Sequence, residues 1–329
     1  MQSFKSFQQR LFQINDATFN DFAWELFLYQ VNNNPIYKSF ITHLGIDIRS
    51  IKNVGEIPFL PISFFKYHEV MTERWEVEAT YESSGTTGAN VSRHYVRNTK
   101  LYLKNTSFIF NHFYGKIEDY HMLFLLPSYI ERGSSSLVSM ADYFIKRSGS
   151  KYSNFYLNNF EELITTVESI RRDAGSKKIL LCGVSFALLE LAEKFAPDLH
   201  DVVIMETGGM KGRRKEITRK ELHNYLIDRF NVLKIHSEYG MTELSSQAYS
   251  QGNAKFKTPP WMKILIRDTN DPLDIGDKRS GGINVIDLAN ISSCAFIETQ
   301  DLGTVDSNGE FEVLGRFDNS DIRGCNLMV

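Results

Sequence analysis

Hydrophobic positions in the first 75 residues recur with the period of an α-helix. The large apolar side chains of one predicted helix lie three or four residues apart, at Phe19, Phe22, Leu26 and Tyr29. A second amphipathic helix is expected over residues 36–45, where Gly45 ends it. The stretch EIPFLPISFFKYHEV has two prolines around extended apolar residues, which predicts that it docks these helices onto the next unit.

From about residue 76 the pattern changes to short apolar runs that alternate with amphipathic segments. The runs that read as strands occur in YHMLFLLPSY, KKILLCGVSFALLELAEKF, DVVIMETGGMKG and NVLKIHSEYGMTE. Repeated strand–loop–helix units predict an α/β domain with a largely parallel sheet. Ligands of such domains bind at the carboxyl ends of strands, so the polar loops after these strands could converge on one site.

After about residue 255 the pattern becomes that of short strands separated by turns. GGINVIDLAN, CAFIETQDLG and GEFEVLGRFD are the expected strands, and DSNGE between the last two is a good hairpin turn. We therefore predict a mixed α/β fold in three parts: a helical segment over 1–75, a nucleotide-binding α/β core over 76–254 and a smaller β-rich subdomain with a C-terminal tail over 255–329.

Composition excludes several classes of protein but does not identify a function. The chain has 329 residues, 42% hydrophobic residues and a net charge of −3, which does not favour nucleic acid as a partner. Its three cysteines are far apart, so they give neither a CxxC metal site nor a disulfide framework, and we expect a reducing, cytoplasmic location. The N-terminus lacks the apolar segment of a signal peptide, and no apolar run is long enough for stable membrane insertion.

One polar stretch, YESSGTTGAN at 81–90, is the first candidate for chemistry. Its central six residues are Ser83, Ser84, Gly85, Thr86, Thr87 and Gly88. Hydroxyls and free backbone amides in such a run can bind phosphate oxygens, although the stretch is not a Walker A loop and has no closing lysine. A plain surface turn is the alternative. Arg93 and His94 follow the loop; His94 could bind phosphate or be a histidine on the surface of a strand.

The segment HSEYGMTE at 236–243 is the second candidate. Tyr239 could stack on a base, Thr242 could hydrogen-bond a phosphate, and Glu243 could bind Mg²⁺, which prefers one or two carboxylates together with phosphate oxygens. The same residues are also typical of a helix start. Further along, Asp301 could bind ribose hydroxyls or be an exposed turn residue, and Arg316 could equally form a surface ion pair.

Four motifs occur in the order SSGTTG, EYGMTE, TQDLG and GRFD. Together they resemble the adenylate-forming superfamily of acyl-CoA synthetases and adenylation domains. A narrower resemblance covers nearly the whole chain: IPFLPISFFK, SSGTTG, SRHYV, LLPSYIERGSSS, VSFALLELAE, METGGMKGRRKE and HSEYGMTELSSQAYS are similar to the acyl-protein synthetase family of LuxE type. That family implies activation of a fatty acid by ATP as acyl-AMP, and then transfer of the acyl group to a cysteine of the synthetase. It also implies Mg²⁺ and an acyl-CoA reductase as a partner protein.

The resemblance assigns roles to individual residues. The six residues 83–88 match the phosphate loop, and Gly208 and Gly209 match the backbone segment along adenine. Tyr239 matches the adenine-stacking aromatic residue, Thr242 the α-phosphate contact and Glu243 the metal ligand. Asp301 matches the ribose aspartate and Arg316 the arginine beside the hinge. Residues 129–133 match the lining of the carboxylate pocket.

Two features depart from the superfamily pattern. Members usually continue past the GRxD motif into a lid domain with a lysine that contacts the reacting groups, and here the sequence ends 13 residues after Arg316, so we expect the lid to be absent. The phosphate loop also lacks the usual Pro-Lys. The missing charge stabilisation could come from a partner protein or from local cations, namely Arg93, Lys211, Arg213 and Arg214.

Cys325, in DIRGCNLMV, matches the acylated cysteine near the C-terminus of the family. Arg323 beside it would favour the thiolate, which is the attacking species. Cys182 and Cys294 belong to apolar segments and are expected in the core.

The leading hypothesis is therefore an acyl-protein synthetase for a fatty acid, with long chains favoured. Two alternatives stay open at this point: an acyl-CoA ligase of the phenylacetate-CoA ligase type, in which free CoA is the thiol, and a non-catalytic subunit that binds nucleotide or acyl groups.

Overall fold

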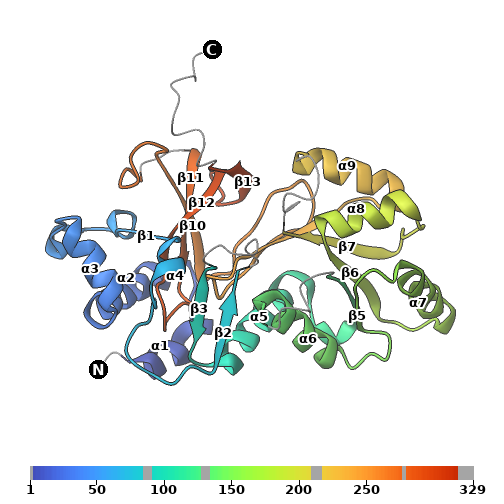
Figure 1. Ribbon diagram of the computed structural model, residues 1–329, viewed down its shortest axis with the longest axis horizontal. Helices are drawn as coiled ribbons and strands as arrows, with labels where there is room; N and C mark the ends of the chain where they lie inside the picture. The colour runs from blue at the N-terminus through green and yellow to red at the C-terminus, as the bar shows by residue number, and fades with distance from the viewer. Residues whose placement is uncertain (1–2, 84–90, 127–133, 209–216, 276–278, 318–329) are drawn as a thin grey trace, which may run out of the picture.

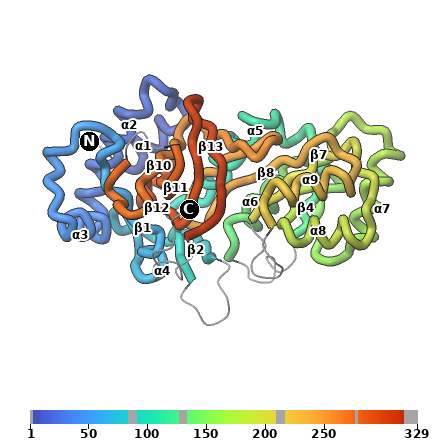
Figure 2. The backbone as a smooth tube through the Cα atoms, turned by 90° about the horizontal axis from the view of Figure 1, so that it is seen from above, coloured from blue at the N-terminus to red at the C-terminus, as the bar shows by residue number. Residues whose placement is uncertain are grey.

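The structure is a computed structural model that describes residues 3–83, 91–126, 134–208, 217–275 and 279–317. Figure 1 shows an elongated molecule with the N-terminal helices and the C-terminal strands at one end and helices α7 to α9 at the other. Figure 2 shows the same division from above. None of the helices in the described ranges is long and apolar enough to cross a bilayer.

A six-stranded sheet forms the α/β part. In spatial order its strands are β5 (Asn154–Tyr156), β4 (Tyr120–Leu125), β6 (Lys178–Val184), β7 (Val202–Thr207), β8 (His236–Tyr239) and β9 (Ala248–Ser250). All neighbours are parallel except β8 and β9. The runs of apolar residues in β4 and β6 are buried, as expected for a parallel sheet covered on both faces.

Helices cover this sheet on both faces (Figure 1). They are α5 (Thr99–Tyr114), α6 (Ser136–Ser148), α7 (Phe160–Asp173), α8 (Ser185–Lys194) and α9 (Arg219–Phe230). The α8–α9 pair lies on the face that carries Glu206, and α5 and α6 lie on the face that carries Cys182 and Met205. The predicted strand–turn–helix of residues 177–195 is confirmed as β6 followed directly by α8.

The second sheet has five strands: β1 (Leu60–Pro61), β10 (Met262–Arg267), β11 (Ser280–Asp287), β12 (Phe296–Val305) and β13 (Phe311–Arg316). The last three were expected from sequence, and Gly309 with positive φ closes the predicted hairpin between β12 and β13. The expected strand CAFIETQDLG corresponds to β12, which reaches Val305; Asp301 is buried within it, so the alternative of an exposed turn residue is wrong.

The N-terminal helices α1 (Phe4–Arg10), α2 (Asp16–Asn33) and α3 (Pro35–His43), with the short α4 (Phe64–Tyr67), pack against this second sheet. The extended stretch around the two prolines does dock the helices, but its β1 pairs with β12 and not with the unit that follows it in sequence. Phe27 and Tyr37 both contact Phe296 of β12. The three-part division of the chain stays a prediction.

The N-terminal helices contact the second sheet through hydrogen bonds as well as through aromatic rings. The buried Gln30 side chain of α2 donates to the carbonyl oxygens of Asn290 and Ile291 and accepts from the amide of Ala295, so it satisfies three backbone groups of the loop that joins β11 to β12. Asn34 donates in the same way to the carbonyl of Ser293.

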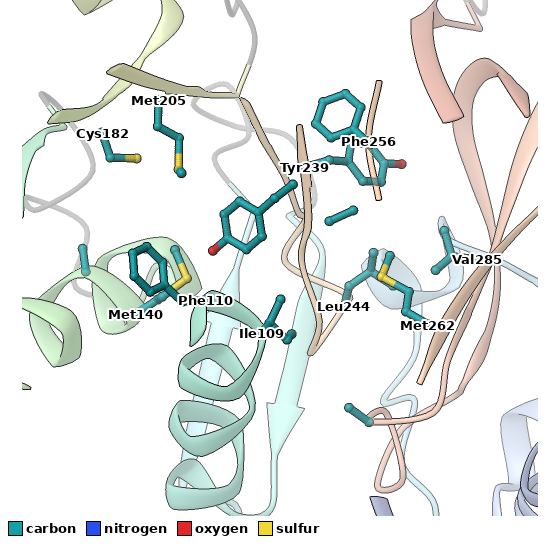
Figure 3. Packing of buried hydrophobic residues seen from close by; sticks show 14 of the residues in the cluster. Ile109, Phe110, Met140, Cys182, Met205, Tyr239, Leu244, Phe256, Met262 and Val285 are labelled. Carbon is teal, nitrogen blue, oxygen red and sulfur yellow. The ribbon is translucent and has the colours of Figure 1, made fainter. Parts of the chain in front are cut away.

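One hydrophobic core extends from the six-stranded sheet to the five-stranded sheet. Figure 3 shows it passing from Cys182 and Met205 in the six-stranded sheet, past Tyr239 and Phe256, to Val285 in the five-stranded sheet. A two-stranded ribbon of β2 (Ala79–Glu82) and β3 (Arg93–Val96) stands between the two sheets (Figure 1).

One acidic side chain inside the six-stranded sheet has no ion-pair partner among the described residues. Glu238 of β8 lies opposite Thr207 of β7 and accepts a hydrogen bond from the Thr207 hydroxyl. Burial raises the pKa of this carboxyl to about 7.

We predict that Gln30→Leu lowers the free energy of unfolding by about 1–3 kcal/mol, because backbone groups of the 290–295 loop lose their partners in a buried place. Chemical denaturation measures the loss. Gln9→Leu on the exposed side of α1 is the matched control and should stay within about 0.5 kcal/mol of wild type. Equal stability of the two variants would contradict the role given to Gln30.

Glu238→Gln should change how stability depends on pH. The unfolded carboxyl ionises around its ordinary value of 4.5, while the folded one keeps its proton up to about 7. The folded state therefore loses stability as pH rises through this window, and the glutamine variant does not. The free energy of unfolding of the variant minus that of wild type should grow between pH 4.5 and 7, by up to about 3 kcal/mol, and then stay level. A difference that is the same at pH 4.5 and pH 8 would contradict the buried neutral carboxyl; Glu161→Gln, exposed on α7, serves as control.

Candidate functional site

The candidate site lies where β8 leaves the six-stranded sheet and meets β12 and β13. The ring of Tyr239, the last residue of β8, packs against Phe256 and Phe311, with centroid distances of 5.8 and 5.4 Å. Its hydroxyl donates to Oδ2 of Asp301 at 2.8 Å. Asp301 and Arg316 are paired positions on β12 and β13, and Arg316 Nε donates to Oδ1 of Asp301 at 2.9 Å. Three residues selected from separate motifs thus meet at one carboxylate.

The carboxylate of Asp301 is buried, whereas the Arg316 side chain on the edge strand is exposed. Each carboxylate oxygen already accepts one hydrogen bond and has a lone pair left for another donor. This arrangement leaves Asp301 able to accept from paired hydroxyls, as a ribose would offer, while Arg316 offers cationic N–H groups at the surface. The roles remain predictions.

Thr242 and Glu243 follow in a turn between β8 and β9, not in the helix start that was the alternative. Glu243 is buried, and burial raises the pKa of its carboxyl, although a hydrogen bond from Ser92 and the charges of Arg316 and Lys66 act in the opposite direction. A buried carboxylate that has no ion pair among the described residues is well suited to a cation.

No group of three or more His, Cys, Asp or Glu side chains in the described ranges could hold a metal ion by itself. Glu243 would therefore bind Mg²⁺ together with phosphate oxygens and water, as this ion prefers. The chemistry of the donor set fits Mg²⁺ better than a transition metal.

Loop 243–246 is held by the last residue of β11 and by the segment that follows it. Asp287 accepts from the amides of Ser245 and Ser246 at 2.9 and 2.8 Å. The Asn290 side chain donates to the carbonyl of Glu243 at 2.9 Å and accepts from the amide of Ser245. Sequence reasoning missed both residues, because their role depends on a contact between segments that are distant in the chain.

Ser83 is the described residue at the start of the predicted phosphate loop. Its hydroxyl accepts from the amide of Ser92 and its amide donates to the carbonyl of Ser92, both at 3.0 Å, so these contacts close the base of the loop. Because Ser92 also hydrogen-bonds Glu243, the base of the loop adjoins the predicted metal ligand. Ser84, Gly85, Thr86, Thr87 and Gly88 lie outside the described residues.

Gly208 follows β7, next to the end of β8, and has positive φ. The Ser185 hydroxyl at the start of α8 lies 2.7 Å from the Gly208 carbonyl oxygen and 3.0 Å from Oε2 of Glu206, and it has one proton to donate between them. The guanidinium of Arg219 in α9 donates to Oε1 of Glu206 at 2.9 Å and to the carbonyl oxygen of Val313 in β13 at 3.4 Å. The predicted adenine segment therefore begins beside Tyr239; Gly209 and residues 129–133 are outside the described ranges.

Arg93 lies away from this group. Its guanidinium pairs with Glu82 across the ribbon, on the face opposite to Ser92 and His94, and both side chains are partly exposed. Its suggested contact with phosphate stays a prediction. His94, in contrast, is not a surface residue: it is buried, with one ring nitrogen 2.9 Å from the carbonyl oxygen of Thr242 and the other 3.0 Å from the hydroxyl of Ser293, so both nitrogens already contact protein groups.

Two of the three cysteines lie in the core, as expected from sequence. Cys182 and Cys294 are both buried, and burial raises the pKa of the Cys182 thiol well above its usual range and that of Cys294 to about 12. Neither is suited to act as a thiolate nucleophile at neutral pH. Cys325 lies outside the described residues.

Comparisons with solved structures show the fold. ATP-bound MatB from Rhodopseudomonas palustris is 17% identical with a TM-score of 0.53, over 73% of this chain and 48% of that one. A variant of o-succinylbenzoate CoA synthetase from Bacillus subtilis is 18% identical with a TM-score of 0.51, over 74% of this chain and 50% of that one. The chain thus spans about half the length of these two proteins and shares the fold of the matched part.

Comparisons of sequence show the family. Two curated proteins, each named long-chain-fatty-acid–luciferin-component ligase, are 24% identical to this chain. The protein from Aliivibrio fischeri matches over 93% of this chain and 86% of its own length, and the protein from Vibrio harveyi over 92% and 84%. The family model described as acyl-protein synthetase, LuxE, matches residues 136–329, which is more than half of the chain. The chain therefore belongs to the LuxE family of acyl-protein synthetases.

Proposed function

We propose that this chain is an AMP-forming acid–thiol ligase that activates a long-chain fatty acid with ATP and transfers the acyl group to its own Cys325. The observation that carries the proposal is the meeting of Tyr239, Asp301 and Arg316 at one carboxylate, beside the turn with Thr242 and Glu243. These are the residue types that hold the base, ribose, phosphate and metal of a bound nucleotide, and the family match gives them this context.

The first step joins the acid to the nucleotide. A carboxylate oxygen of the fatty acid attacks the α-phosphorus of ATP, and the bond from that phosphorus to the bridging oxygen breaks, releasing pyrophosphate. Asp301 would hold the ribose, Thr242 would hydrogen-bond the α-phosphate, and Glu243 would hold Mg²⁺. Bound Mg²⁺ would neutralise charge on the phosphate oxygens. The chain supplies positioning and charge, which are the main contributions to this type of reaction.

The second step moves the acyl group to sulfur. A thiolate attacks the carbonyl carbon of the acyl adenylate, the carbon–oxygen bond to the phosphate breaks, and AMP leaves; the thiol proton passes to solvent. Burial of Cys182 and Cys294 supports Cys325 as the acceptor, since it is the remaining cysteine of the sequence. An acyl-CoA reductase is the proposed consumer of the thioester.

We expect Glu243→Gln to lower acid-dependent exchange of pyrophosphate into ATP at least about tenfold, because loss of residues that merely support a metal ligand already costs 10–100-fold. Since burial raises the pKa of Glu243, wild type should also need more Mg²⁺ for half-maximal exchange as pH falls, and the variant should lose this dependence. Glu161→Gln is the control. Exchange at the wild-type rate in Glu243→Gln would remove Glu243 from the metal role.

We expect the substitution Cys325→Ser to separate adenylate formation from acyl transfer. Acid-dependent pyrophosphate exchange should stay near the wild-type rate, while hydroxylamine-labile acyl label on the protein should disappear, because a serine hydroxyl without an activating base is a weak nucleophile. The measurement is incubation with labelled fatty acid, ATP and Mg²⁺, followed by mass mapping of the label, with Cys294→Ala as the control that keeps it.

Other results would favour other functions. Full acyl label on the Cys325→Ser variant would show that another residue accepts the acyl group. A wild type that carries no label but forms acyl-CoA when CoA is added would be an acyl-CoA ligase. Binding of ATP with neither exchange nor label would indicate a non-catalytic subunit.

A further inference from the structure

We propose that His94 is a positioning residue that holds the turn carrying Thr242 and Glu243 against the base of the phosphate loop. The inference rests on the proposed function, because it assigns the role of a side chain that touches neither nucleotide nor acid. Its basis is the buried contact of one imidazole with two segments far apart in the sequence.

The hydrogen bonds of His94 determine where its proton lies. The carbonyl oxygen of Thr242 can only accept, so the ring nitrogen 2.9 Å away, Nδ1, must donate. The other nitrogen, Nε2, then accepts from the Ser293 hydroxyl at 3.0 Å. Burial lowers the pKa of His94 to about 4, so this neutral form with a single tautomer is the one present at neutral pH.

The contacted carbonyl is a sensitive point of the turn. It belongs to the peptide group that joins Thr242 to Glu243, and a peptide group is planar, so fixing the oxygen fixes the direction from which the Glu243 side chain starts. The carbonyl of Glu243 is fixed in turn by Asn290. His94 therefore acts on the predicted phosphate contact and the predicted metal ligand together.

Strand β3 and the residues before it hold the turn at two points. Ser92 and His94 are two residues apart, face the same side and are both buried, while Arg93 between them faces the other side. Ser92 hydrogen-bonds the Glu243 carboxyl, and His94 donates to the peptide before it. Ser92 is also bonded to Ser83, the described residue at the base of the predicted phosphate loop, so these contacts set the position of that base relative to the Glu243 carboxyl.

The ring is itself held in place. Phe65 of α4 contacts His94 edge to face at a centroid distance of 5.8 Å, and Ser293 belongs to the loop that Asn34 of the N-terminal helices hydrogen-bonds. A histidine suits this place because a neutral imidazole has one donor and one acceptor on opposite sides of a rigid ring.

A pair of amide substitutions tests the proposal. In His94→Asn the amide nitrogen can occupy the place of Nδ1 and still donate to Thr242, whereas in His94→Gln it reaches the place of Nε2 and points at Ser293. Both variants lose the ring and add the same chemical group. We expect the concentration of Mg·ATP for half-maximal pyrophosphate exchange to stay within about threefold of wild type in His94→Asn and to rise at least about tenfold in His94→Gln. The KM for fatty acid should change little in either.

The thermal midpoints of the two variants, measured without ligand, separate positioning from folding. Similar midpoints with different Mg·ATP dependence support the proposal, and Ser293→Ala, which removes only the partner of Nε2, should behave as His94→Asn does. The proposal is overturned if the Asn and Gln variants shift the Mg·ATP dependence equally, or if neither shifts it.

The shift of the thermal midpoint by Mg·ATP gives the same comparison without catalysis. If wild type shows no exchange but is stabilised by Mg·ATP, the proposed reaction is wrong, and the half-saturating concentrations of the His94 variants still decide the positioning role. If Mg·ATP does not stabilise wild type and supports no exchange, both proposals fall.

Discussion

The buried loop between β11 and β12, residues 288–295, is the constraint on which the arrangement of the site depends. Few of its backbone groups can bond within a sheet, so other segments must satisfy them. Gln30 and Asn34 do so from the N-terminal helices, and Thr72 does so through its amide and its hydroxyl. Because unsatisfied polar groups are costly in a dry interior, each of these segments has one favourable position.

The same loop reaches the candidate site from its other side. Asn290 holds the carbonyl of Glu243, and the Ser293 hydroxyl meets His94. The N-terminal helices, the ribbon and the turn after β8 are thus connected through a few hydrogen bonds between neutral groups. Neutral groups suit this purpose, since a charged linker would cost desolvation and would compete electrostatically with a phosphate or a metal ion. Titratable side chains occur elsewhere in the site: the Asp287 carboxyl accepts from the amides of Ser245 and Ser246, and Glu243, Asp301 and Arg316 are the predicted ligand contacts.

Local patterns in the sequence predicted several of the elements, and they selected three residues that the structure brings together at the Asp301 carboxylate. Continuous apolar runs predicted β4, β6 and β7, and turn residues predicted the β12–β13 hairpin, because both signals come from neighbours in the chain. Whether Asp301 lies within the strand or in an exposed turn could not be decided from sequence, because the deciding contact is with Arg316 on the separate strand β13. His94 could not be placed for the same reason. Nothing near it in sequence shows that Thr242 and Ser293 will enclose it, and a histidine has no burial preference strong enough to decide.

The burial of two of the three cysteines supports the proposal that Cys325 is the acyl acceptor. Cys182 and Cys294 are used as small apolar residues, and burial keeps their thiols protonated. A cysteine that accepts an acyl group has to reach the adenylate and then present the thioester to another protein, and neither of these two can do so without opening the core. Residues 318–329 follow Arg316 and Phe317 directly, and Phe317 is tied to the body by its amide, which donates to the carbonyl of Gln300, and by the Arg267 guanidinium over its ring. The chain therefore passes the predicted ribose carboxylate just before the segment that contains Cys325. Under the proposed function, the segment that contains the acceptor is therefore attached to the body next to the carboxylate that would bind the ribose.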